Sequence, residues 1–126
     1  MGTWGYGNFD SDAALDMLAV WRRKILDTIR ESFTLSSEDV PYSGHGDSRI
    51  IANIDILTTL CEHYGTCPTL ELEEILEWKQ KYVGVYKRFI QNITRREDVE
   101  DLTKRLEVIE ATFDRFYEVI ERLCED

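Results

Sequence analysis

The sequence is poor in several residue types that would point to particular classes of protein. It has only two histidines, and its three cysteines are an odd number without the spacing of a disulfide framework, so we expect reduced thiols. Charged residues interrupt every apolar segment before it reaches the ~18 residues that a membrane span needs. No basic stretch followed by an apolar block opens the chain. We therefore expect no signal peptide, no membrane partner and a cytoplasmic location.

Basic residues are also scarce relative to acidic ones. Fifteen lysines and arginines face 25 aspartates and glutamates, for a formal net charge of −10. This balance argues against nucleic acid as a partner and favours rapid association with a basic protein. The 43% hydrophobic and 32% charged residues suit a single globular domain of this length.

The periodicity of apolar residues predicts an all-α fold, a four-helix bundle-like single domain. The expected helices cover residues 11–33, 48–64, 69–93 and 95–124, and a non-helical arm rich in glycine and aromatic residues covers 1–10. Gly65 follows the second helix as a C′ glycine, and Gly84 suggests a close helix–helix approach or a bend. The expected inward residues of the first three helices include Leu18, Trp21, Ile25, Ile29, Phe33, Ile50, Ile54, Leu57, Cys61, Tyr64, Leu72, Ile75, Leu76, Tyr82, Val83, Tyr86, Phe89, Ile90 and Ile93.

The last predicted helix carries an uninterrupted a/d stripe from Val99 to Leu123. Two interpretations are possible: an intramolecular bundle, or self-association of a structural subunit through this seam. Phe113 and Phe116 are bulky for a two-stranded seam, and the other helices have apolar faces that need cover. We therefore favour the bundle and a free monomer.

The first twelve residues, MGTWGYGNFDSD, combine three aromatic residues with three glycines. With Ala13 to Asp16, this run resembles the opening of a bacterial family named only as a domain of unknown function (family 4259). Beyond Asp16 the resemblance is one of pattern: helices and an acidic balance. The resemblance implies no enzyme activity and no functional residues, and some members of the family look like immunity proteins of toxin systems.

Few residues offer reactive chemistry. Cys61, His63 and Cys67 are close in sequence, but zinc needs a fourth ligand, such as His45 or Cys124, so structural cysteines are the preferred interpretation. A small enzyme or metal protein using His45, His63 and the cysteines is the alternative. We expect no catalytic, cofactor or metal site. The basic run Arg22, Arg23 and Lys24 is interpreted as a solvated face.

The acidic residues are distributed unevenly. Residues 97–126 hold eleven acids and four bases, whereas residues 69–96 hold four acids and six bases. The spacing places several acids on one flank of the last helix, and the loop before the second helix adds others. The predicted partner-binding residues are Glu107, Glu110, Asp114, Glu118, Glu121, Glu38, Asp39, Tyr42 and Asp47. This acidic surface predicts binding to a basic protein. Together with the resemblance to family 4259, it leads us to expect a non-enzymatic immunity protein that binds the catalytic domain of a toxin.

Overall fold

The structure is a computed structural model that describes residues 7–8, 11–35, 46–66 and 68–124. It contains four helices: α1 (Asp12–Leu35), α2 (Gly46–Tyr64), α3 (Leu72–Gln91) and α4 (Arg96–Cys124). No strand forms within these ranges, so the predicted all-α, bundle-like fold is confirmed. The predicted arm over 1–10 lies outside the described residues except for Gly7 and Asn8, which are exposed.

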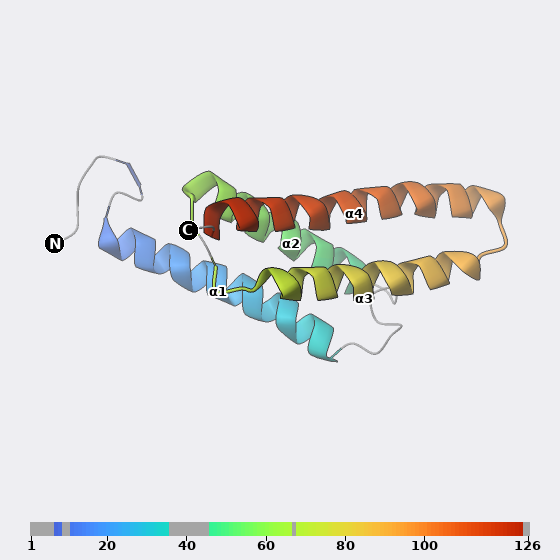
Figure 1. Cartoon of the computed structure of the whole chain (residues 1–126), viewed down its shortest axis with the longest axis horizontal. Helices are drawn as coiled ribbons and strands as arrows, with labels where there is room; N and C mark the ends of the chain where they lie inside the picture. The colour runs from blue at the N-terminus through green and yellow to red at the C-terminus, as the bar shows by residue number, and fades with distance from the viewer. Residues whose placement is uncertain (1–6, 9–10, 36–45, 67, 125–126) are drawn as a thin grey trace.

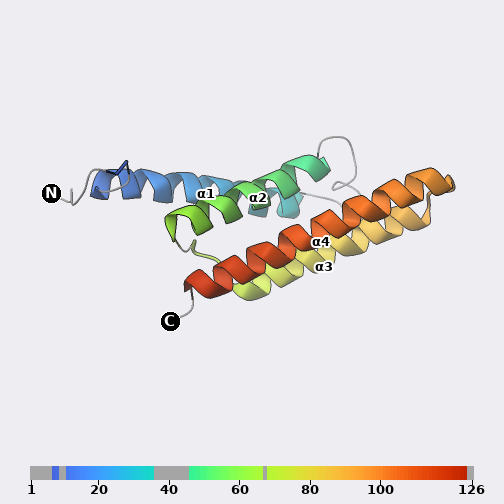
Figure 2. The same cartoon turned by 90° about the horizontal axis from the view of Figure 1, so that it is seen from above.

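The helices form two antiparallel pairs that pack face to face. Figure 1 shows α3 and α4 joined by a short turn, and Figure 2 shows the α1–α2 pair layered on them. In both views the N-terminal end of α1 and the α3–α4 turn extend past the other helices, at opposite ends of the molecule. The bundle core is therefore confined to the central overlap of the two pairs.

The core consists of aliphatic residues around a line of aromatic rings. The Phe33 and Trp78 rings stack with centroids 5.5 Å apart, and the Trp78 and Phe116 rings stack at 6.4 Å. These contacts join α1, α3 and α4. The core residues with no measurable exposure are Ile29, Ile54, Leu57, Cys61, Tyr82, Ile109, Phe113, Phe116 and Ile120. The stripe of α4 is thus used inside the bundle.

Local interactions account for the start of α1 and the end of α2, whereas α3 starts later than predicted. The Ala14 N–H donates to Ser11 Oγ at 3.2 Å, so Ser11 caps α1. Gly65 has a φ of +63°, and the Thr66 N–H donates to the Cys61 carbonyl, which is the Schellman pattern. The prediction that the third helix starts near Thr69 is wrong, because Glu71 has extended dihedrals and α3 begins at Leu72.

Several predicted core residues are exposed. Trp21 is 56% exposed, and Tyr64, Leu76 and Phe89 also remain accessible. Phe89 lies towards the α3–α4 turn, where α3 extends past α1 and α2 (Figures 1 and 2). Trp21 is exposed for a different reason: Leu18, one turn earlier in α1, is only 4% exposed, so Trp21 lies at the edge of the covered side of α1. Helical periodicity identifies the apolar side of each helix, but it does not show where along the helix a neighbour stops.

Gly84 does not mark a close approach between helices. A Cβ built at this position would meet only the Arg88 Nη1 atom of the same helix, 3.9 Å away. The prediction of close approach is therefore wrong: Val83 and Val85 on either side of the glycine are buried, but no atom of another helix lies within 4 Å of the position that a Cβ at Gly84 would take.

Candidate functional site

The five acidic residues predicted on the last helix lie together on the solvent side of α4. Because they recur every three or four residues, they share the side opposite the buried Ile109, Phe113 and Phe116. Glu110 is half-buried and the other four are exposed. We call this set the acidic face: Glu107, Glu110, Asp114, Glu118 and Glu121.

The edge of the acidic face next to α3 is partly neutralised. Lys79 Nζ lies 2.6 Å from Asp114 Oδ1, and Glu110 lines a shallow hollow together with Lys79 and Lys87. No ion-pair partner occurs within the described ranges for Glu107, Glu118 or Glu121. These three carboxylates are the part of the face that is free to meet a cation from outside.

Two arginines of α4 point to α2 rather than to the acidic face. Arg115 lies 2.9 Å from one oxygen of Glu62 and 3.2 Å from Asp55, and Arg122 lies 3.0 Å from the other oxygen of Glu62. The hydrogen bonds from Arg115 and Arg122 lower the pKa of Glu62. Arg122 therefore pairs between helices, and Glu118, four residues earlier on α4, has no ion-pair partner in the described part of the chain.

Most of the predicted loop residues are not among the described residues. Glu38, Asp39 and Tyr42 lie outside the described residues, and Asp47 lies in the first turn of α2. His45 of the alternative enzyme or metal hypothesis also lies outside them, as does Cys67. Apart from Asp47, the predicted partner-binding residues that the structure describes all lie on α4.

Cys61 and His63 do not form a common site. Cys61 is buried, and burial raises the pKa of its thiol to about 11, whereas His63 is exposed and packs against the Tyr64 ring. Across the described ranges, no group of three or more histidine, cysteine or acidic residues is arranged to hold a metal ion. The prediction of reduced thiols holds for Cys61 but is wrong for Cys124, which is disulfide-bonded, because sequence spacing does not show which chain segments meet in space.

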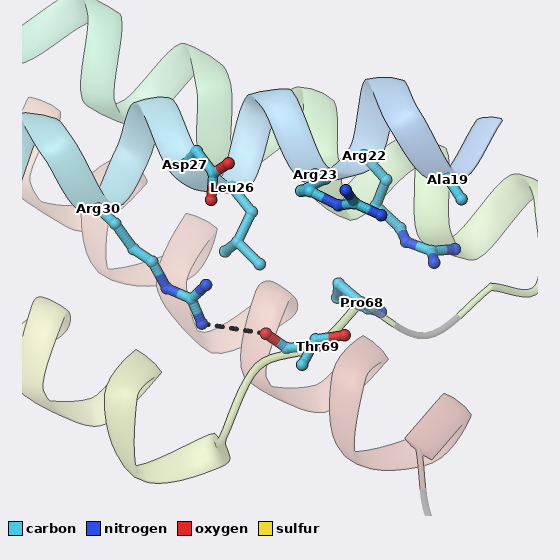
Figure 3. A pocket seen from close by; sticks show the side chains of 8 residues that line it. All are labelled: Ala19, Arg22, Arg23, Leu26, Asp27, Arg30, Pro68 and Thr69. Atoms are coloured by element: carbon cyan, nitrogen blue, oxygen red, sulfur yellow. Dashed lines mark hydrogen bonds between the residues drawn. The ribbon is translucent and has the colours of Figure 1, made fainter. Parts of the chain in front are cut away.

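A second polar feature was not predicted as a site. Three arginines of α1 line a hollow of about 310 Å³ that faces Pro68 and Thr69, in the segment between α2 and α3 (Figure 3). We call it the arginine hollow; its lining residues are Ala19, Arg22, Arg23, Leu26, Asp27, Arg30, Pro68 and Thr69. The basic run Arg22, Arg23 and Lys24 was interpreted from the sequence as a solvated face, but its members have different surroundings in the structure. Arg22 and Arg23 line the hollow, whereas Lys24 lies over the Trp21 ring, 5.1 Å from its centroid.

Arg30 is held firmly at one end of the hollow. Its Nε and Nη2 atoms each lie 2.9 Å from an oxygen of Glu74, and Nη2 also donates to the Thr69 carbonyl at 3.0 Å. The hydrogen bond with Glu74 raises the pKa of Arg30. At the other end, Arg22 donates to the Thr66 hydroxyl. The sequence signal for this site was the spacing of Arg22, Arg23 and Arg30, which places all three on one flank of a helix.

Comparison with known proteins places this architecture in a family. The model of the family described as "Domain of unknown function (DUF4259)" matches residues 2–123. The chain belongs to this family. The DUF4259 match covers α1 to α3 and nearly all of α4, so the resemblance suggested by the first sixteen residues extends over the whole bundle.

No curated protein and no solved structure matches the chain. Of the helices in the described ranges, none combines the length and apolar character needed to cross a membrane.

Proposed function

We propose that this DUF4259 protein acts by binding a basic protein through the acidic face of α4. Three exposed and uncompensated carboxylates, Glu107, Glu118 and Glu121, carry this proposal. They lie on one long helix, so they present a fixed row of negative charge without ordering a loop on binding. Such a row accelerates encounter with a positively charged surface and aligns the two proteins.

The most concrete partner is the catalytic domain of a bacterial toxin, which makes the protein an immunity protein. A cleft that acts on nucleic acid or nucleotides is basic, and an acidic helix is complementary to it in charge. The resemblance of some family members to immunity proteins adds support. In this proposal the protein neutralises its partner by binding and has no enzymatic activity of its own.

Self-association through α4 is the less favoured alternative. A coiled-coil dimer would need an apolar seam on this helix, but Ile109, Phe113 and Phe116 have no measurable exposure because the α4 seam packs inside the bundle. The outer side of the helix carries the acidic face, where two copies would repel each other.

The cytoplasmic location of an immunity protein stays a prediction. The disulfide at Cys124 counts against it, because disulfides persist mainly in oxidising compartments. A non-reducing mass measurement on protein alkylated inside the producing cell tests this point: a disulfide at Cys124 in the cell excludes a reducing compartment.

The experiment that tests the proposed function asks first whether a toxin gene lies beside this one, and uses the catalytic domain of that toxin. Co-expression of the wild-type protein with that domain should restore growth, and the purified proteins should associate at a rate that falls steeply with salt. The variant Glu107→Lys/Glu118→Lys/Glu121→Lys should associate about tenfold or more slowly at low salt and lose most of the salt dependence.

A matched control makes the same change in net charge at residues outside the acidic face. Asp16, Glu31 and Glu73 are exposed residues of α1 and α3, so Asp16→Lys/Glu31→Lys/Glu73→Lys makes the same change in net charge off the acidic face. This control should keep wild-type protection. The proposal fails if no neighbouring toxin domain is neutralised, or if both triple variants lose or retain binding equally.

A further inference from the structure

The arginine hollow has one end in which positive charge is balanced. Arg30 is bonded through two nitrogens to both oxygens of Glu74. Figure 3 shows Asp27 on the Arg30 side of Leu26, away from the other two arginines. The two carboxylates offset the Arg30 charge, so this end is a structural anchor that ties α1 to the start of α3.

The opposite end has two guanidinium groups without a carboxylate. Arg22 donates to the neutral hydroxyl of Thr66, and Arg23 has no hydrogen-bond or ion-pair partner in the part of the chain that the structure describes. A guanidinium has five N–H donors, so Arg22 keeps most of its donors available. Asp27 also lines the hollow, but neither Arg22 nor Arg23 forms an ion pair in the described part of the chain. In a chain with ten more acids than bases, two adjacent arginines without an ion pair are a local concentration of positive charge.

The hollow also has the form of a small binding site. Its volume of about 310 Å³ lies at the small end of the range for ligand pockets. Leu26 and Pro68 form apolar walls, and Figure 3 shows the Arg22 and Arg23 side chains on the opposite side of the hollow from Pro68. A group held here would touch cationic donors on one side and apolar carbon on the other.

We propose that the Arg22–Arg23 end of the arginine hollow binds the phosphate group of a small molecule. A phosphate carries a charge of about −1.5 to −2 at neutral pH, which matches the two uncompensated guanidinium groups. Its oxygens accept the parallel N–H pairs of an arginine fork. A single carboxylate brings half that charge. This site lies on α1 and is independent of the acidic face on α4 and of the proposed partner.

The test uses inorganic phosphate as the probe. Wild-type protein in a low-salt buffer without oxyanions is titrated with sodium phosphate, with sodium acetate, and with sodium chloride at matched ionic strength. Amide chemical shifts of Ala19, Leu26 and Thr69 and the heat of binding are recorded. Phosphate should give a saturable shift at these amides, acetate a weaker one and chloride none.

Two variants locate the binding. Arg23 has no described partner, so Arg23→Gln should leave the melting temperature unchanged while weakening phosphate binding by about tenfold, the loss expected for a charge-assisted hydrogen bond. Arg22→Gln/Arg23→Gln should abolish saturable binding. Arg95→Gln/Arg96→Gln removes the same charge at exposed residues beside the α3–α4 turn and should bind phosphate as the wild type does.

Three results would overturn the proposal. These are non-saturable phosphate shifts in the wild type, equal weakening in the Arg95→Gln/Arg96→Gln control, and acetate binding as tight as phosphate binding. The last result would assign the hollow to carboxylates. None of these measurements involves a toxin domain, so their results do not depend on whether the acidic face binds a partner.

Discussion

Replacing each of two glycines with alanine should change the free energy of unfolding in opposite directions. Gly84 lies inside α3 with ordinary helical dihedrals, and an added Cβ would meet only Arg88 Nη1 at 3.9 Å. Gly65 lies after α2 with a φ of +63°, and an added Cβ there would meet nothing within 4 Å. Both positions therefore have room for a methyl group, and they differ in backbone conformation.

The expected magnitudes follow from that difference. Alanine is better than glycine inside a helix by up to about 1 kcal/mol, part of which comes from the reduced freedom of the unfolded chain. Gly84→Ala should therefore stabilise the fold by about 0.5–1 kcal/mol. A left-handed residue with a Cβ costs about 1–2 kcal/mol, partly offset by the same unfolded-state effect, so Gly65→Ala should destabilise by about 1 kcal/mol.

Thermal and urea unfolding followed by circular dichroism measure both changes. For a chain of 126 residues, about 1 kcal/mol corresponds to about 4 °C in Tm, so the two variants should differ by about 6–8 °C. A loss of stability in Gly84→Ala would refute the reasoning, because it would mean that another helix or a bound partner approaches α3 at this glycine. Unchanged stability in Gly65→Ala would mean that the Schellman turn is not maintained in solution.

Further predictions concern Glu62 and Cys61. Hydrogen bonds from Arg115 and Arg122 lower the pKa of Glu62 in the folded protein. The contribution of Glu62 to stability is therefore fully present above its unfolded-state pKa of about 4.3, and it is lost as the pH falls through its lower folded-state pKa. The Tm difference between wild type and Glu62→Gln should therefore be constant near neutral pH and shrink in acid; a difference that persists down to pH about 2 would contradict this account. Burial raises the pKa of the Cys61 thiol to about 11, so iodoacetamide at pH about 8 should label Cys61 rapidly only after unfolding in urea. Rapid labelling of the native protein, with the site identified by peptide mass, would show that the core opens at α2.

The amino-acid sequence alone determined the fold class and much of the local structure. Apolar residues at helical spacing predicted four helices, and Gly65 was predicted as the residue that ends α2. These features depend on interactions within a few residues of the chain. The acidic face of α4 was also predictable, because residues three and four apart share one side of a helix.

Only the tertiary structure decided which residues meet across helices. The exposure of Trp21, the disulfide at Cys124 and the inter-helix pairing of Arg122 with Glu62 all depend on how the chain segments are placed relative to one another. The arginine hollow has the same origin, because Pro68 and Thr69 reach α1 only after the chain has passed through α2. Periodicity gives the direction in which a side chain points from its own helix, whereas burial and pairing require the positions of the neighbouring helices.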